Sequence, residues 1–234
     1  MKLPYEKYVG RVGRVISISK DNSIKVIEKY IIEFKLEDTG EIVIGESISN
    51  NLYGITPLWV IDEARKRYIG KTHWITGSVA YTSDESKEER GYFTVKRFSP
   101  VNVTDVVISD DQQAPVRVIF LSQDGKQGYV DVSLSNTNAE EMLTYYHQFS
   151  EMFLSDDPRT TYKWGERVWE LIEKHEVVIG MTMQQVQFSF GKPTDIKTTK
   201  SSSGDSDMWI YGTARTGFFK YIHFTNGRVT VIQD

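Results

Sequence analysis

The stretch Val178–Pro193 constrains the fold of this chain more than any other, because it carries the residues that begin and end a short helix. Thr182 is a preferred N-cap residue, and Gln185 stands at the third helical position, where its side chain completes a capping box. Gly191 suits the left-handed backbone that follows many helices, and Pro193 prevents the helix from continuing. We therefore expect a helix that begins after Thr182 and ends before Gly191.

β-Branched and aromatic residues predict three strands after this helix, at residues 207–213, 217–225 and 228–233. Asn226-Gly227 is typical of a tight two-residue hairpin turn between the last two strands. The polar segment Lys197–Asp207 is rich in Ser and Gly and is expected to be a mobile loop. The helix and the strands together predict a helix-plus-antiparallel-sheet module over residues 177–234.

The N-terminal part of the chain alternates apolar and polar residues in the manner of β-strands. A strand, an acidic turn with glycine and a second strand that ends in Ser-aliphatic-Ser occur at Ile32–Ser49 and again at Val118–Ser135. This recurrence predicts two related SH3-like β-barrel units, at residues 5–62 and 63–137. The alternative is that any two hairpins share such a pattern. Tyr8–Ser19 is expected to be a strand, with a bulge at its two glycines.

Helical segments are expected to connect these parts. Thr56–Lys66 is predicted as a short helix or connector whose Trp59 packs in a core. Residues 138–176 form a predicted helical linker, with amphipathic helices at Asn138–Leu154 and Tyr162–His175. The linker also contains two tryptophans expected to pack on the β units, Trp164 and Trp169. The sequence as a whole predicts an α+β protein.

Composition narrows the class of function. The net charge is −4 and the charges are interspersed, with no basic tract of the kind that follows a nucleic-acid backbone. The chain has no cysteine, which excludes disulfides, thiolate zinc sites and cysteine nucleophiles. No apolar run approaches the roughly 20 residues of a membrane-spanning helix. The first residues lack the apolar stretch of a signal peptide, so the chain as written is expected to be soluble.

No pattern of catalytic or metal-binding residues is present, so we predict no catalytic residue, no metal and no cofactor. The histidines are far apart in sequence and lack close metal-type partners: His73, His147, His175 and His223. Each is expected to be solvated or hydrogen-bonded within the fold. Four aspartates lack the spacing of a calcium-binding loop: Asp105, Asp110, Asp111 and Asp124. Nucleophile elbows, phosphate loops and dinucleotide fingerprints are also missing.

The strands after the predicted helix are unusually aromatic, and this predicts a binding surface. Alternation places Trp209 with Tyr211 on one face of their strand, and Phe219 with Tyr221 on one face of the next. One face of the sheet must cover the helix at 182–190. The other face would bind a partner if it is exposed. Alternatively, the helical linker covers that face, and the aromatic residues only hold the domains together.

The C-terminal residues carry a family resemblance. The matching motifs, in order, are Gly180-Met-Thr182, Gln185-Val186, Gly191-Lys-Pro193, Trp209-Ile-Tyr211 and Phe224-Thr-Asn-Gly-Arg-Val229. Over about residues 165–234 this pattern resembles the SmpA/OmlA-type module of small outer-membrane-assembly lipoproteins. The resemblance implies a fold similar to half of β-lactamase-inhibitor protein, and a binder or scaffold without an active site.

The leading functional hypothesis is therefore a non-enzymatic protein- or peptide-binding or scaffolding protein of a bacterial cell envelope. It would be periplasmic or associated with the outer membrane, through a lipid anchor not included in this sequence. A cytoplasmic location stays open, and the sequence identifies neither the partner nor the oligomeric state. The alternative is a small-molecule or glycan-binding protein, or a weak hydrolase. Its cleft would lie between the β units and the C-terminal module, with His73, Trp74 and Tyr92 as contacts.

Overall fold

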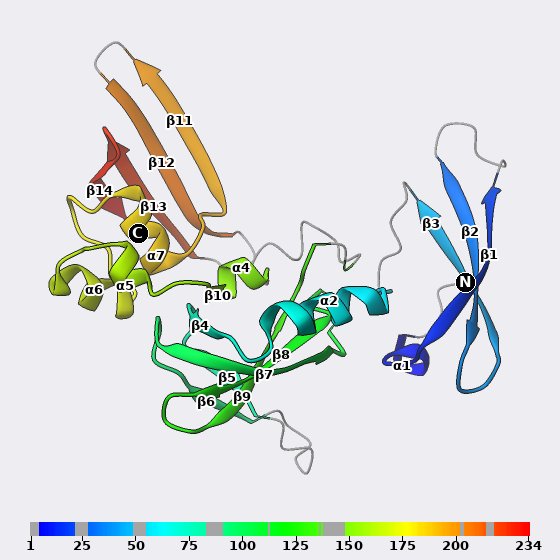
Figure 1. Cartoon of the computed structure of the whole chain (residues 1–234). Coiled ribbons are helices and arrows are strands. Elements are labelled where there is room, and N and C mark those ends of the chain that lie inside the picture. The colour runs from blue at the N-terminus through cyan, green and yellow to red at the C-terminus, as the bar shows by residue number, and fades with distance from the viewer. Residues whose placement is uncertain are drawn as a thin grey trace. The chain divides into compact units, whose positions relative to one another are not determined.

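The computed structural model describes the chain at residues 5–21, 28–48, 55–82, 91–111, 113–135, 137, 148–201, 204–213 and 218–234. Helices and antiparallel sheets both occur, so the predicted α+β class is confirmed (Figure 1). The chain divides into two compact units, Met1–Thr161 and Tyr162–Asp234. This division falls inside the segment 138–176 that the sequence predicts as a helical linker.

Three antiparallel strands form the N-terminal sheet, in the order β1 (Gly13–Asp21), β2 (Lys29–Leu36) and β3 (Ile42–Ile48). The expectation of a strand from Tyr8 onward is wrong at its start, because the short helix α1 (Tyr5–Tyr8) precedes β1. Gly10 has a φ of +73°, a backbone conformation that favours glycine. It is therefore a turn residue between the helix and β1, and not part of a bulged strand.

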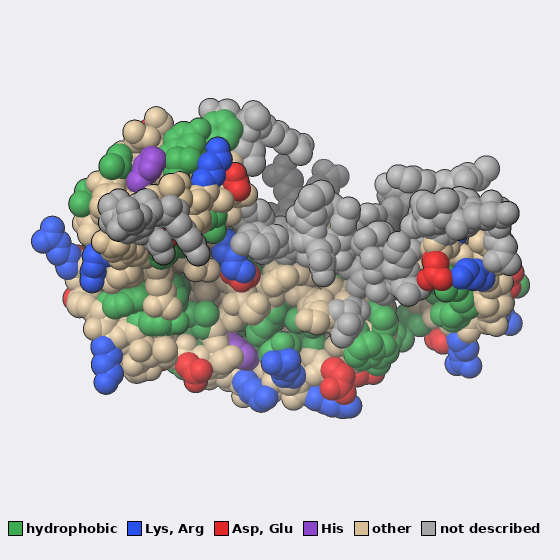
Figure 2. Space-filling view, turned by 90° about the horizontal axis from the view of Figure 1, so that it is seen from above, with side chains coloured by type: hydrophobic (Ala, Val, Ile, Leu, Met, Phe, Trp, Pro, Cys, Tyr) green, Lys and Arg blue, Asp and Glu red, His purple; other side chains and the backbone are tan. Residues whose placement is uncertain are grey.

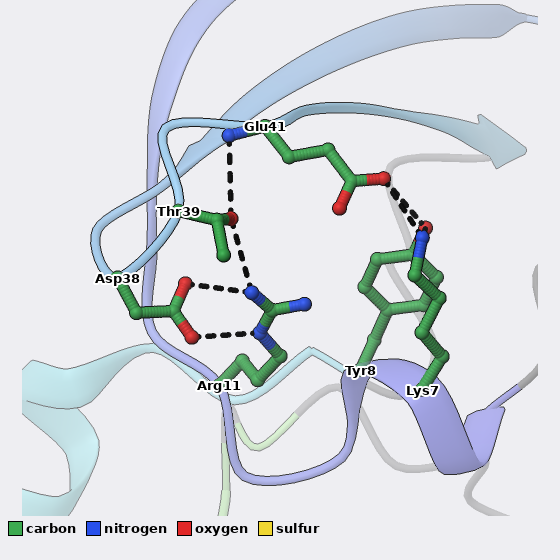
Figure 3. Close-up of polar contacts among 6 residues, drawn as sticks. All are labelled: Lys7, Tyr8, Arg11, Asp38, Thr39 and Glu41. Atoms are coloured by element: carbon green, nitrogen blue, oxygen red, sulfur yellow. Dashed lines mark hydrogen bonds and ion pairs between the residues drawn. The ribbon is translucent and has the colours of Figure 1, made fainter.

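Polar contacts tie the segment before β1 to the turn between β2 and β3 (Figure 3). Arg11 donates two hydrogen bonds of 2.8 Å to the carboxylate of Asp38, and this contact holds the pKa of Asp38 below its ordinary value. Glu41 accepts hydrogen bonds from Lys7 at 3.0 Å and from Tyr8 at 3.1 Å. Both carboxylates remain in contact with water. These ion pairs therefore fix the position of the segment before β1 more than they stabilise the fold.

The second sheet has seven strands in the order β10-β4-β7-β8-β9-β5-β6. In chain order these are β4 (Thr72–Ile75), β5 (Val79–Tyr81), β6 (Tyr92–Thr94), β7 (Pro100–Ile108), β8 (Val116–Ser122), β9 (Gln127–Val132) and β10 (Phe153–Leu154). The predicted closure of the two β units into barrels is wrong. A barrel requires its first and last strands to pair, whereas both described sheets end in open edges.

Helix α2 (Leu58–Tyr68) covers one face of the second sheet. Its residues Ile61, Ala64 and Tyr68 share a core with strand residues that have no exposed surface, among them Val103, Val106, Val118 and Phe120. Trp59 was expected in a core, but 55% of its surface is exposed. The prediction failed because Trp59 lies beside the buried stripe, whose members are three and four residues apart.

The predicted helix Asn138–Leu154 is only partly within the described residues, because positions 138–147 lie outside them. In the remainder, helix α4 (Phe149–Met152) forms a single turn. The last two residues are not helical, since they form β10 and pair with β4. A tertiary contact has thus replaced the final turn that the apolar periodicity predicts.

The C-terminal unit combines two helices with a four-stranded antiparallel sheet (Figure 1). After α5 (Pro158–Thr161), the elements are α6 (Glu166–Glu173), α7 (Met183–Phe190), β11 (Asp195–Ser201), β12 (Gly204–Thr213), β13 (Phe218–Thr225) and β14 (Arg228–Gln233). The three predicted strands are confirmed. Asn226 and Gly227 have φ angles of 50° and 74°, as the predicted hairpin turn requires.

The expectation of a loop at Lys197–Asp207 is wrong. Strands β11 and β12 pair along this segment, from Asp195 opposite Ile210 to Ser201 opposite Gly204. The serines and threonines suggested a loop because they are polar. In an exposed edge hairpin, however, both faces contact water and polar side chains are tolerated.

The tryptophans of the helical segment pack inside the C-terminal unit. The ring centroids of Trp164 and Trp169 are 5.1 Å apart, and that of Trp164 lies 5.2 Å from Phe188 of α7. We expected these residues to pack on the N-terminal β units. They instead join α6 to α7.

On the surface, basic and acidic side chains are interspersed over the face drawn in Figure 2.

Helix α7 begins with the predicted capping box. The side chain of Thr182 accepts a hydrogen bond of 3.3 Å from the backbone N–H of Gln185. The side chain of Gln185 accepts one of 2.9 Å from the backbone N–H of Thr182. Gly191 follows the helix with a φ of +81°. The cap residues predicted from the sequence are confirmed, and they fix where α7 begins and ends.

Replacement of the cap tests this assignment. We expect Thr182→Ala to lower the free energy of unfolding of the C-terminal unit by about 1 kcal/mol, because one N-terminal N–H of α7 loses its acceptor. Urea denaturation followed by circular dichroism measures the change. Thr199→Ala on the exposed edge strand is the matched control and should change stability by less than about 0.5 kcal/mol. Equal losses in both variants would contradict the capping role.

Candidate functional site

Two of the four aromatic residues predicted to bind a partner are buried beneath helix α7. Trp209 and Tyr211 are 8% and 9% exposed. The hydroxyl of Tyr211 donates a hydrogen bond of 3.1 Å to the backbone oxygen of Gly191, and its ring meets Phe190 edge-on at 5.5 Å. The ring of Trp209 lies 4.8 Å from Phe224. These residues join the helix to the sheet, so their surfaces are not available to a partner.

The other two residues, Phe219 and Tyr221, lie on the opposite face of the same sheet. Their rings are nearly parallel, with centroids 6.2 Å apart. The strand register places Val231 of β14 on this face as well, and also Ile210 of β12, which is buried at 9% exposure. Phe219 is 37% and Val231 is 43% exposed. We call this surface, together with Met208, the Phe219 face.

The helices of the C-terminal unit are associated with the Trp209 side of the sheet. Helix α7 reaches the sheet through Phe190, which contacts Tyr211 and the ammonium group of Lys220. Helix α6 packs on α7, with Trp169 at 6.1 Å from Phe188. The contacts described between helix and sheet side chains therefore lie on one face. The alternation predicted from the sequence was sufficient to pair the aromatic residues, but it did not identify the face that the helix covers.

A small hollow opens between α7 and the sheet on the Trp209 side. Its volume is about 270 Å³, and His175, Phe190, Tyr211 and Lys220 line it. His175 contacts the backbone oxygen of Ser189 at 2.9 Å through Nδ1. The ammonium group of Lys220 is 2.8 Å from Asp234. Ligand pockets usually measure about 300–1,000 Å³, so this hollow is at most large enough for a small polar group.

The three residues of the alternative cleft do not come together. His73 and Trp74 belong to β4, whereas Tyr92 belongs to β6, and four strands separate β4 from β6 in the sheet order. Tyr92 is 72% exposed, while His73 is 5% exposed. A ligand that contacted the hydroxyl of Tyr92 would therefore not reach the imidazole of His73 along this sheet.

His73 is nonetheless unusual, because its imidazole is buried among aromatic rings. The centroids of Phe149, Tyr68 and Phe153 lie 5.3, 5.7 and 6.4 Å away. Neither ring nitrogen has a hydrogen-bond partner of good geometry among the described residues. Burial lowers the pKa of His73, the nearby carbonyl of Leu154 offsets this in part, and Lys71 lowers it further. The expectation of a solvated or hydrogen-bonded His73 is wrong, because apolar side chains from α2, α4 and β10 surround it.

The described residues offer no assembled metal site. In this part of the chain, no three His, Asp or Glu side chains gather closely enough to hold an ion. The aspartates named from the sequence instead have local partners, such as Arg117 at 2.8 Å from Asp110 and Lys126 at 2.8 Å from Asp124.

Among the helices that the structure describes, none is both long and apolar enough to cross a membrane.

The two faces of the C-terminal sheet predict different responses to truncation. Trp209→Ala should lower the free energy of unfolding by about 3–5 kcal/mol, because it leaves a cavity against Phe224. Phe219→Ala should cost less, about 1–2 kcal/mol, since its ring is partly in water. Denaturation in urea followed by circular dichroism measures both values. Similar losses for the two variants would contradict the assigned faces.

His73 predicts a pH dependence of stability. Its pKa in the folded chain is below the ordinary value of 6.5, so the unfolded chain binds the proton more readily. Stability is therefore fully present above about pH 6.5 and falls, by at most about 1.4 kcal/mol per pH unit, as the pH decreases toward the folded pKa. Urea denaturation between pH 7.5 and 5 measures this slope.

His73→Phe should reduce that slope, because it removes the titrating group from the aromatic cage. The slope is the readout, since the new ring changes packing at every pH. His223→Gln is the control, because His223 is partly exposed and lies within 3.3 Å of Gln233. An unchanged slope in His73→Phe would show that other groups cause the acid sensitivity.

Comparison with known proteins adds no relative. No family model, curated protein or solved structure matches this chain. The resemblance of residues 165–234 to the SmpA/OmlA-type module therefore stays a prediction from the motifs, and the function has to be argued from the geometry of the chain itself.

Proposed function

We propose that this chain is a non-enzymatic protein- or peptide-binding or scaffolding protein whose C-terminal unit presents the Phe219 face to a polypeptide partner. One observation carries the proposal. The sheet already holds helix α7 on its Trp209 face, and its opposite face still exposes apolar side chains, with Phe219 at 37% and Val231 at 43%. Exposed apolar patches of this kind are typical of interaction sites.

The chemistry of the face favours a polypeptide over a small molecule. Phe219 and Tyr221 form a flat, stacked pair instead of the walls of a pocket. Aromatic residues and methionine are enriched in protein interfaces, and Met208 adds a flexible side chain to the same face. His223 and Gln233, whose side chains are 3.3 Å apart, provide polar groups at its border. The face therefore has the composition of an interface with an apolar centre and a polar rim.

Two parts of this proposal depend on the sequence alone. The non-enzymatic character follows from the missing catalytic motifs. The bacterial cell envelope as the location, periplasmic or at the outer membrane, depends on the resemblance of residues 165–234 to the SmpA/OmlA-type lipoproteins. The small-molecule or glycan-binding alternative has less support, because Tyr92 lies on β6, four strands away from His73 and Trp74 on β4.

Site-specific photo-crosslinking tests the proposed surface. Full-length protein with p-benzoylphenylalanine at position 231, on the exposed edge strand β14, should form a discrete crosslinked product in the cells that produce the protein naturally. Adding Phe219→Asp should reduce that product at least about tenfold, because a charge at the centre of an apolar interface is unpaired. Mass spectrometry identifies the partner.

The matched control carries the crosslinker at Tyr92, which is 72% exposed in the other unit. It should not give the same product. Circular dichroism must first show that Phe219→Asp is folded like the parent chain. A product that persists undiminished in the folded Phe219→Asp variant would contradict the assigned face, and so would an identical product from position 92.

A further inference from the structure

Residues 148–154, which we call the strap, form one edge of the second sheet. They comprise the single turn of α4 and the two residues of β10, and in the described sheet β10 pairs only with β4. The backbone N–H of Thr76 donates a hydrogen bond of 2.9 Å to the carbonyl of Met152, and that of Phe149 donates one of 3.1 Å to the carbonyl of Ser133. Short edge segments open more readily than the central strands of a sheet. We therefore expect the strap to open while the central strands β7 and β8 stay paired.

Two phenylalanines pack the strap onto the sheet. Phe149 and Phe153 are 7% and 2% exposed. The ring of Phe149 stacks on that of Tyr68 in α2, with the centroids 3.8 Å apart. Both phenylalanine rings also approach the imidazole of His73, at 5.3 Å for Phe149 and 6.4 Å for Phe153. His73 is therefore part of the surface on which the strap packs.

This surface suits a neutral imidazole better than a charged one. His73 is 5% exposed, and neither ring nitrogen has a hydrogen-bond partner of good geometry among the described residues. A second proton on the ring would place a charge away from water, and burial of a charge costs much more than burial of a neutral polar group. Contact with aromatic faces offsets only part of that cost. An imidazolium at this position therefore favours a conformation that brings it into water.

The groups that act on His73 leave this preference in place. Burial lowers its pKa most, the backbone carbonyl of Leu154 opposes that effect, and the ammonium group of Lys71 lowers the pKa further. Ionisable side chains come from each charged element around the imidazole: Tyr68, Arg65 and Arg67 of α2, Lys71 before β4, Asp105 of β7 and Glu151 of the strap.

None of the described carboxylates is placed as a counterion for an imidazolium. Asp105 lies 3.7 Å from Arg65. Glu151 follows Phe149 by two residues, so the turn of α4 directs it away from the side on which that ring packs. The acidic residues of α2 are on its exposed side, at Asp62 and Glu63. A proton on His73 would therefore stay uncompensated as long as the strap is in place.

We propose that the strap is a pH-sensitive latch, in which protonation of His73 releases residues 148–154 from β4 and α2 while β7 and β8 stay folded. Histidine suits this role because its ordinary pKa lies in the physiological range. Release gives the imidazolium access to water and opens the edge of β4 at Trp74 and Ile75. Because the chain runs from the strap to Tyr162, where the C-terminal unit begins, release also lengthens the connection between the two units.

Hydrogen exchange followed by mass spectrometry tests the latch in the full chain. The protection of each segment is its measured exchange rate compared with the intrinsic rate at the same pH. Protection of the strap should be constant from pH 7.5 to about pH 6.5. Below that it should fall by up to about tenfold per pH unit, because opening takes up one proton. Protection of β8, the internal reference, should not change down to pH 5.5.

Histidine variants assign the effect to one residue. His73→Gln and His73→Phe do not titrate in this range, so in either variant the strap should be equally protected at pH 7.5 and 5.5. The reverse variant replaces the other three histidines by Gln, at His147, His175 and His223. It keeps His73 as its single histidine and should keep the whole loss of protection, so it tests the assignment without any change in the aromatic cage.

Three results would overturn the proposal. The first is a strap whose protection in the parent chain does not fall between pH 6.5 and 5.5. The second is an equal loss of protection in β8, which would mean that the proton unfolds the whole sheet. The third is a loss that disappears in the reverse variant, or one that persists in a His73→Gln or His73→Phe chain folded like the parent by circular dichroism.

Discussion

A sheet with an apolar face has to cover that face, and this constraint accounts for most of the architecture. In the second sheet Val103 and Val106 of β7 lose all contact with water because α2 lies over them. In the C-terminal unit, α7 covers one side of the sheet through Phe190 and Tyr211. Each helix contributes a narrow apolar stripe, and burial of that stripe stabilises helix and sheet together.

The local features of this fold were predictable because their causes lie within a few residues. The capping box at Thr182 and the turn at Asn226-Gly227 each depend on side chains and φ angles of neighbouring positions. The alternation of Trp209 with Tyr211, and of Phe219 with Tyr221, likewise follows from the geometry of a strand. These predictions needed no knowledge of which elements pack together.

Several of the errors involve contacts between distant parts of the chain. β10 is a strand only because β4 offers it an edge, and the apolar periodicity of its own segment favours a helix. Trp59 is exposed because the core lies over Ile61 and Ala64, and Trp59, two residues before Ile61, points to the other side of the helix. The same limitation applies to the candidate site. Alternation separated two aromatic pairs, but only tertiary contacts, such as the hydrogen bond from Tyr211 to Gly191 and the ring contact with Phe190, show which pair faces the helix.

The first two sheets share a strand arrangement but differ in how deeply it is buried. Val15 pairs with Phe34 in the first sheet and Val103 pairs with Phe120 in the second, and in both sheets a register shift follows the valine. In the second sheet both members of the pair are 0% exposed. In the first sheet Phe34 is 8% exposed, whereas Val15 is 47% exposed. Because apolar side chains in water give up the stabilisation that burial provides, this pair stabilises the second sheet more than the first.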